Sequence, residues 1–269
     1  MENSITIVYR EDAAPYALSP HHHTSHELIF LSSGRATFRI GDNRYDAKAG
    51  DLLLISNLEP HDLEVTEWPY HRHYVLIQPD TLHTVLREPE LEALFRYRPG
   101  HFRHVVSLNP AESAKALALL THMAEEERNK LPFWQGCLEN GLRTLLIDLY
   151  RNHPALSPQQ SMPGTARVML EIQRHIDLHD HEDLRLDAVA KLFHFDMYHL
   201  SHQFRKTTGY SFKEYLIRRR ISRATDRLRN TTEPIAQVAE ACGFHSVPHF
   251  IRTFRRITET TPLQYRKRG

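Results

Sequence analysis

The chain of 269 residues is long for one compact domain, so two domains are expected. With 41% hydrophobic and 25% charged residues, its composition is that of a folded protein and excludes wholesale disorder. No apolar run approaches the ~20 residues of a membrane span, the start MENSITIVYRED lacks a secretory signal, and two cysteines imply no disulfide framework. We therefore expect a cytoplasmic protein with no membrane partner.

Charge is unevenly distributed along the chain, although the net charge is only +1. Residues 1–164 hold 15 Lys and Arg against 21 Asp and Glu, whereas residues 165–269 hold 19 against 12. Within residues 205–269 the excess is larger, with 15 basic side chains against 5 acidic ones. An acidic front and a basic back indicate that only the back contacts a polyanion.

The first 80 residues have the pattern of β-strands. Short β-rich runs are separated by Gly, Asn, Asp and Pro, as in an antiparallel sandwich or barrel. The runs are ITIVY (5–9), ELIFL (27–31), ATFRI (36–40), DLLLI (51–55) and HYVLIQ (73–78).

Two amphipathic helices are predicted next, over 112–130 and 133–152, because apolar residues recur there at helical spacing. Their leucines form faces larger than a small barrel should need to cover, so they are either packed against the barrel or shared with a second subunit. We expect a homodimer through these helices. The leucines are Leu117, Leu120, Leu138, Leu142, Leu145 and Leu149. The segment 153–165 combines three prolines with Ser, Gln and Gly, so it is predicted to link a domain of residues 1–152 to one of residues 166–269.

The second domain is helical in pattern and contains an internal repeat. Val189-Ala190 aligns with Val238-Ala239 at a separation of 49, and Leu200, Phe204 and Tyr215 align with Phe250, Phe254 and Tyr265 at a separation of 50. Each copy predicts a helix, a tight turn and a second helix capped by Asp196 or Ser246, which is a helix-turn-helix pattern.

Between the copies, residues 211–230 contain no Gly or Pro and predict a single helix. A helix of ~19 residues is roughly 28 Å long, close to the ~34 Å of one DNA turn. A rigid spacer of this size can present both second helices to successive major grooves on one DNA face.

The stretch IAQVAEACGFHSVPHFIRTFRRITETTPLQYR resembles the signature of the AraC family of bacterial transcription regulators. The matching residues are Ile235, Val238, Ala239, Gly243, Phe244, Ser246, Phe250, Arg252, Phe254, Thr261, Pro262, Tyr265 and Arg266. Two residues depart from the pattern. Pro248 lies inside the second recognition helix, in the first turn, where its missing N–H is tolerated. Glu259 replaces the usual Gly, which would place a carboxylate near DNA or force a different turn.

The resemblance implies two units that read the major groove of promoter DNA, in a regulator that acts on RNA polymerase. The family's base-facing positions fall on Tyr198, Ser201 and His202 in the first unit and on Val247, Pro248, His249, Ile251 and Arg252 in the second. Arg252 is the favoured base-reading residue, because a guanidinium can bridge guanine O6 and N7. Phosphate contacts are expected from Arg205, Lys206, Arg255 and Arg256, the alternative being that these are solvated charges.

The stretch SPHHHTSHELIFLSSG (19–34) resembles the first motif of the cupin folds, to which the sensory barrel of the AraC family belongs. His21, His23, Glu27 and Gly34 fit the first motif, and Gly50 and His61 fit the second. The second motif departs at Ser56 and Leu58, where metal-binding cupins have Pro and Gly. The resemblance implies that His21, His23, Glu27 and His61 converge inside the barrel.

Three interpretations of this cluster stay open. Three His and one Glu are chemically sufficient to hold a divalent metal such as Zn or Fe. The same four residues can instead bind a hydroxylated organic effector with no cofactor. In the third interpretation, His22 and His26 are exposed edge residues, and the other histidines are hydrogen-bonded barrel lining.

The expected fold is α+β with two domains: an N-terminal cupin-like β-barrel with dimerisation helices, and a C-terminal all-α domain with two helix-turn-helix motifs joined by a long helix. We expect a transcription activator, not an enzyme, that responds to a small molecule. HHHTSHEL (21–28) resembles the start of sugar-responsive sensors, so a carbohydrate is the favoured effector. One alternative is a metal-dependent cupin enzyme, an isomerase or dioxygenase, fused to a DNA-binding domain. The other is a DNA-binding protein whose barrel serves only dimerisation.

Overall fold

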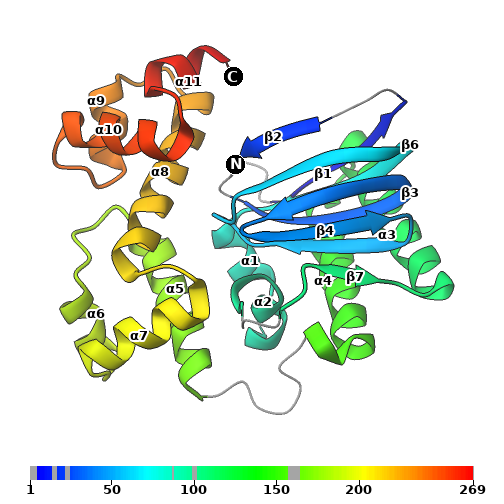
Figure 1. The fold of residues 1–269 in the computed structure, drawn as a ribbon, viewed down its shortest axis with the longest axis horizontal. Helices are drawn as coiled ribbons and strands as arrows, with labels where there is room; N and C mark the ends of the chain where they lie inside the picture. The colour runs from blue at the N-terminus through cyan, green and yellow to red at the C-terminus, as the bar shows by residue number, and fades with distance from the viewer. Residues whose placement is uncertain are drawn as a thin grey trace. The chain divides into compact units, whose positions relative to one another are not determined.

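The computed structural model describes residues 5–13, 17–21, 25–86, 88–98, 102–156 and 164–268 (Figure 1). The chain divides into two compact units. The first, called the sheet unit, comprises residues 1–96 and 100–161, and the second, called the helical unit, comprises residues 97–99 and 162–269. Within the described ranges, no helix is long and apolar enough to cross a membrane.

The described part of the sheet unit contains one antiparallel sheet of seven strands. The strands are β1 (Ile5–Asp12), β2 (Ala17–His21), β3 (His26–Ile40), β4 (Asn43–Lys48), β5 (Asp51–Ile55), β6 (His61–Ile77) and β7 (Val105–Ser107). Their order is β1-β6-β3-β5-β7, with β2 paired to β6 and β4 paired to β3. The centre of the sheet is therefore the pairing of its two longest strands, β3 and β6.

Strand β3 is longer than the sequence pattern predicted. ELIFL and ATFRI, expected as two strands, are the two halves of one strand of 15 residues. Gly34 joins them with a φ of +78°, and a Cβ there would lie 2.5 Å from the carbonyl oxygen of Glu67. Only glycine fits this close approach to β6, so the strand bends without ending.

The two faces of the sheet pack differently. The outer face carries alternating residues such as Leu28, Phe30 and Val75, which form one core with the helices of the unit. The inner face carries Ile29 and Leu31 and forms a second core with apolar residues of β4, β5 and β6. This alternation follows from the two-residue period of a strand and creates a sheet with two buried faces.

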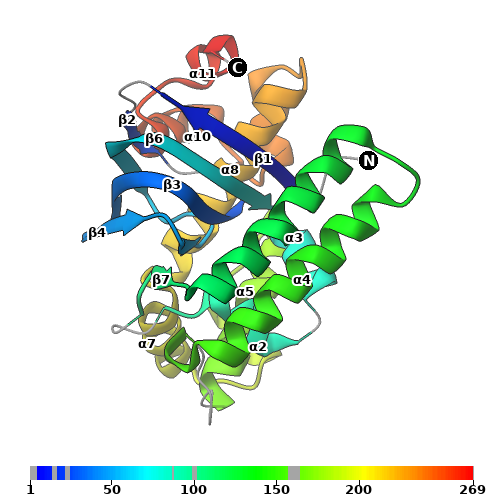
Figure 2. The same ribbon diagram turned by 90° about the vertical axis from the view of Figure 1, so that its right-hand side faces the viewer.

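In the part of the sheet unit that the structure describes, the helices that cover the outer face are α1 (Pro79–Val85), α2 (Pro89–Arg96), α3 (Pro110–Asn129) and α4 (Trp134–Asn152). A short 3₁₀ turn, η1 (Pro154–Leu156), follows α4. Figure 2 shows α3 and α4 side by side. Helix α3 begins with a reciprocal capping box, in which the Asn109 side chain accepts from Glu112 N and the Glu112 side chain accepts from Asn109 N.

The leucines of α3 and α4 correct one prediction. Of the six assigned to a subunit contact, only Leu117 is exposed. Leu120, Leu138, Leu142, Leu145 and Leu149 are buried in the core on the outer face. They lie there because β1, β3, β5 and β6 also expose apolar residues on that face, so the leucines are needed within the unit.

The helical unit contains α5 (Gly164–His179), α6 (Leu186–Leu192), α7 (Met197–Thr208), α8 (Phe212–Asn230), α9 (Ile235–Ala241), α10 (Val247–Thr258) and α11 (Pro262–Arg268). Helix α8 is the single connecting helix that was predicted, and it begins with a capping box between Ser211 and Glu214. Its 19 residues separate the pair α6–α7 from the pair α9–α10.

A buried ion network joins α5 to α8. Arg219 Nε lies 2.6 Å from Asp177 Oδ1, and Arg219 Nη2 lies 3.8 Å from Asp180 Oδ2. Arg223 Nε lies 2.8 Å from Asp180 Oδ1. Asp177, Asp180 and Arg219 are each at least 95% buried. Because buried charges require partners, this network fixes α5 against the connecting helix.

Candidate nucleic-acid interface and effector site

Both recognition helices, α7 and α10, begin at the predicted caps. The carboxylate of Asp196 accepts hydrogen bonds from the backbone N–H groups of Tyr198 and His199, each at 3.0 Å. The Ser246 hydroxyl accepts one from His249 N at 3.4 Å. Pro248 occupies the first turn of α10, as predicted, where no intrahelical donor is needed.

The internal repeat is confirmed by equivalent packing in the two halves. Phe204 and Tyr215 form an edge-to-face pair with ring centroids 5.4 Å apart, and Phe254 and Tyr265 form the same pair at 5.6 Å. Leu200, Phe204, Phe250 and Phe254 are all fully buried, as expected for core residues.

The turn after α10 repeats the turn after α7, so the alternative of a different turn at Glu259 is wrong. Gly209 has a φ of +78° and Glu259 a φ of +60°, both left-handed. Thr208 donates to Phe204 O at 2.8 Å, and the equivalent Thr258 donates to Phe254 O at 2.9 Å. Glu259 therefore adopts a conformation that glycine adopts more easily.

The residues predicted to contact DNA form the solvent side of α7 and α10. Tyr198 is 79% exposed, and only Ser201 and Val247 in the set are half-buried. The exposed members are Tyr198, His202, Arg205, Lys206, Pro248, His249, Ile251, Arg252, Arg255 and Arg256. The five cations in this list form no ion pair with a described residue, so their charge is available to a polyanion.

The second candidate site lies on the inner face of the sheet unit. Glu27 alternates with Ile29 and Leu31 on β3, and His61 alternates with Leu63 and Val65 on β6. The Glu27 Oε2 atom lies 3.2 Å from His61 Nε2, and both side chains are almost fully buried. Two of the four predicted effector residues are thus brought together.

The pKa of His61 is raised above its ordinary value. Burial lowers the pKa, but the hydrogen bond to Glu27 and the charge of Glu27 outweigh this effect. His61 Nδ1 lies 2.9 Å from the carbonyl oxygen of Glu59, so both ring nitrogens face acceptors. A charged imidazolium, which donates from both nitrogens, satisfies this arrangement best.

Of the other two predicted members, the structure describes only the backbone of His21. His23 lies outside the described residues, as does the side chain of His21. The backbone of His21 pairs with His61 in the β2–β6 ladder, which puts the two positions opposite each other. Among the described residues no group of three or more His, Cys, Asp or Glu side chains can hold a metal. A metal site at Glu27 and His61 would therefore need at least one further ligand, such as His21 or His23.

The structure also corrects the assignment of His26 as an exposed edge residue. His26 is fully buried on the outer face, where its Nδ1 accepts a hydrogen bond from Asn57 N at 3.0 Å and its ring packs on Phe95. His22 lies outside the described residues. Leu58 has a φ of +73°, so the backbone keeps a left-handed conformation where cupins have Gly.

The inner face holds a second polar cluster that the sequence analysis missed. Arg72 is 93% buried, forms an ion pair with Asp12, and lies over the Tyr70 ring at 4.8 Å. The alternation of YHRHY (70–74) carries the signal, because Tyr70, Arg72 and Tyr74 share a face of β6. This cluster adds a cation and a phenol to the inner face.

Comparisons with known proteins assign both units. Residues 5–132 match the AraC-like ligand binding domain family, and residues 189–268 match a helix-turn-helix domain family. The HTH-type transcriptional activator RhaS of Enterobacter sp. (strain 638) is 24% identical over 258 residues, covering 96% of this chain and 91% of the relative. RhaS of Escherichia coli (strain K12 / DH10B) is 25% identical over 264 residues, with the same coverage.

Solved structures share the fold over nearly the whole chain. Unsaturated fatty acid bound wild-type ToxT from Vibrio cholerae gives a TM-score of 0.63 at 14% identity, covering 97% of this chain and 94% of ToxT. ToxT bound to (E)-4-(8-methylnaphthalen-1-yl)but-3-enoic acid gives a TM-score of 0.63 at 13% identity, covering 98% of each chain. At this identity the likeness concerns the fold alone.

Proposed function

Because the chain belongs to the AraC family of transcription regulators, we propose that it activates transcription from promoters that α7 and α10 recognise together. The chain is a DNA-binding regulator and not an enzyme, so the alternative of a metal-dependent isomerase or dioxygenase is wrong. Activation is supported by the relatives, which are named as transcriptional activators.

The repeated, exposed surface of α7 and α10 carries the proposal. Two recognition helices separated by a 19-residue connecting helix suit one face of a duplex. Arg252 is proposed to read a guanine, and Arg205, Lys206, Arg255 and Arg256 to contact phosphates.

The test compares one base contact with one phosphate contact. Arg252→Ala should weaken binding to a duplex enriched by selection in vitro by ~1–3 kcal/mol and leave random duplexes nearly unaffected. Lys206→Ala should weaken both duplexes alike and lower the salt slope by about one unit. Equal losses on both duplexes for Arg252→Ala would refute its base-reading role.

The effector is proposed to bind on the inner face of the sheet unit, at Glu27, His61, His21 and His23. Glu27 can accept hydrogen bonds from hydroxyl groups, which supports a sugar, and His61, whose two ring nitrogens face Glu27 and the carbonyl oxygen of Glu59, holds this carboxylate in place. A competing class is an apolar acid, because the solved ToxT structure holds a fatty acid and the inner face combines an apolar core with the buried cation Arg72.

Calorimetry of the full chain against monosaccharides and apolar carboxylates tests this site. Sugar binding should be lost in Glu27→Gln and His61→Gln and retained in Glu64→Gln, a matched change at an exposed residue of β6. Operator binding without ligand should be unchanged in all three. Binding of an apolar acid, but of no sugar, would keep the site and refute the sugar.

We further propose a homodimer that contacts RNA polymerase when bound to DNA. The exposed side of α3, which carries Leu117, is the proposed subunit contact in place of the buried leucines.

A further inference from the structure

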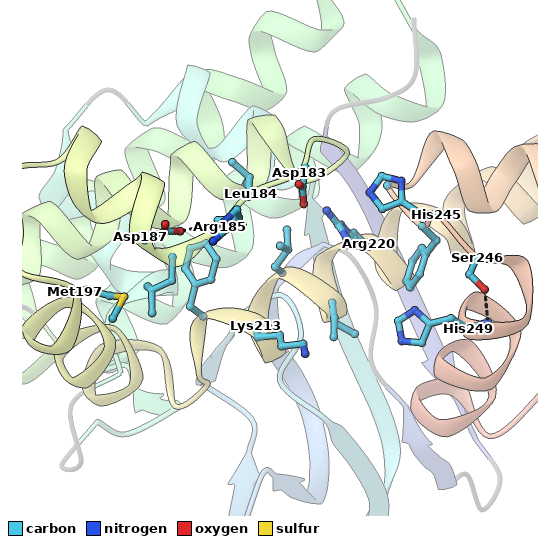
Figure 3. Close-up of a pocket in the computed structure, with 16 residues that line it drawn as sticks. Asp183, Leu184, Arg185, Asp187, Met197, Lys213, Arg220, His245, Ser246 and His249 are labelled. Carbon is cyan, nitrogen blue, oxygen red and sulfur yellow. Dashed lines mark hydrogen bonds and ion pairs between the residues drawn. The ribbon is translucent and has the colours of Figure 1, made fainter.

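A groove of about 670 Å³ lies in the helical unit between its two helix-turn-helix halves (Figure 3). Its floor is the side of α8 that carries Phe212, Leu216 and Ile217. One wall consists of residues 183–187 with Met197, and the other of residues 243–246 with His249. Its volume is in the range of pockets that hold small organic molecules.

The base of the groove is apolar. Phe212, Leu216 and Phe244 are 94–95% buried and form its base, while Leu184 and Ile217 are half-buried and line it higher up. None of these side chains can donate a hydrogen bond, so the base of the groove cannot satisfy a phosphate. The lining therefore favours an occupant with an apolar body over the DNA backbone.

Two cationic side chains of α8, Lys213 and Arg220, lie beside this apolar base. Lys213 and Arg220 extend from α8 in Figure 3, with His245 and His249 on the adjoining wall. Lys213 is exposed and makes no ion pair with any described residue. Two carboxylates also line the groove: Asp187 is paired with Arg185 at 3.1 Å, and Asp183 lies beside Arg220 in Figure 3.

Arg220 is held in place before any ligand binds. Its Nε donates to Asp180 O and its Nη2 to Glu182 O, each at 2.7 Å. A Cβ at Gly243 would lie 2.9 Å from Arg220 Nε, so glycine makes room for the guanidinium. Nη1 makes no hydrogen bond within the described part of the chain, which leaves a fixed donor for an anion.

The groove borders the first turn of each recognition helix. Met197, in one wall, precedes the base-facing Tyr198, and His249, in the other, follows the base-facing Pro248. A duplex that contacts α7 and α10 together must span the groove between them. An occupant standing above the rim would therefore obstruct DNA.

We propose that this groove is a second ligand site, separate from the inner face of the sheet unit, that takes an amphipathic anion and competes with DNA. The apolar body rests on Phe212, Leu216 and Ile217. Its carboxylate or sulfonate lies at the rim, between Lys213 and Arg220. The regulator would then respond to one ligand through the sheet unit and to another through its DNA-binding unit directly.

The test uses the full chain with biphenyl-4-carboxylate and its uncharged match, biphenyl-4-carboxamide. Calorimetry should show the carboxylate binding about tenfold more tightly, because only the anion can pair with Lys213 and Arg220. Lys213→Gln should remove most of this difference, and Ile217→Glu should abolish binding. Lys191→Gln, an exposed change outside the groove, should leave binding intact.

Fluorescence anisotropy of a labelled, in vitro selected duplex gives the second readout. The carboxylate should weaken DNA binding by the wild type and by the Glu27→Gln variant. It should not weaken DNA binding by the Ile217→Glu variant, whose circular dichroism spectrum should match that of the wild type and so show that the variant is folded. Binding of the carboxylate that survives Ile217→Glu but is lost in Glu27→Gln would place the ligand on the sheet and overturn the proposal. The proposal would also be overturned if the wild type bound no carboxylate and Lys213→Gln lowered the affinity for DNA, because DNA itself would then be the occupant.

Discussion

Replacing Glu259 by glycine should stabilise the helical unit. Glu259 ends α10 at a φ of +60°, and a left-handed conformation costs an ordinary L-residue roughly 1–2 kcal/mol. Glycine avoids this cost but loses about 0.5–1 kcal/mol more conformational freedom on folding. The expected net gain is therefore about 0.5–1 kcal/mol.

Two further variants separate backbone strain from charge. Glu259→Gln keeps the strain and removes only the carboxylate, which opposes the helix dipole, so it should gain a few tenths of a kcal/mol at low salt. Gly209→Glu introduces glutamate at the equivalent left-handed position after α7 and should destabilise by an amount similar to the gain in Glu259→Gly.

Urea unfolding followed by helical circular dichroism, with hydrogen exchange of residues 247–268, measures these differences. Both Glu259 variants should also bind random DNA more tightly than the wild type, because each removes a negative charge beside a polyanion. If Glu259→Gly were no more stable than Glu259→Gln, the backbone of Glu259 would not be strained and the reasoning would fail.

Three other predictions concern the sheet unit. Because the pKa of His61 is raised on folding, its stabilising contribution is complete below the ordinary value of 6.5 and disappears as pH rises through the folded value. In urea unfolding, the difference in stability between the wild type and His61→Gln should thus shrink toward high pH. Burial lowers the pKa of His73 to about 4, but His73 is present in both proteins and so does not affect this difference. Gly34→Ala should cost more than Gly41→Ala in thermal unfolding, because a Cβ at Gly34 meets backbone at 2.5 Å and one at Gly41 meets nothing within 4 Å; equal losses would contradict this. Leu117→Arg should give a folded monomer in sedimentation if α3 forms the dimer, whereas Leu145→Arg, at a site 3% exposed, should unfold the unit.

The helical unit was predictable from sequence because its determinants are local. The caps at Asp196 and Ser246 and the absence of Gly and Pro in α8 each act within one or two turns of helix. The core residues that repeat at a separation of 50 show that both halves use the same local pattern. The residues that line the groove were not predictable, since Leu184, Lys213 and Phe244 come from three separate segments that only the packing of α6, α8 and α9–α10 brings together.

The sheet unit was harder to predict because its strands depend on distant partners. The first half of β6 alternates only two apolar residues, Leu63 and Val65, with polar ones such as Asp62 and Glu64, which is too short a run to predict a strand, yet it pairs with β3 and β2. The leucines of α4 were assigned to a dimer for a similar reason. An amphipathic pattern shows that a helix face is buried, but does not show against which partner.

The buried network between α5 and α8 determines where the helical unit can be cut. The helix-turn-helix match begins at residue 189, which is downstream of Asp177 and Asp180. A fragment starting there would lose both carboxylates that pair with Arg219, together with the buried Met169, Ile172 and Ile176 of α5. Burying each such apolar side chain contributes ~1.5–3 kcal/mol, so the loss is a large part of the ~5–15 kcal/mol that stabilises a typical domain. The smallest autonomous DNA-binding fragment should therefore begin at Gly164, with α5 included as its first helix.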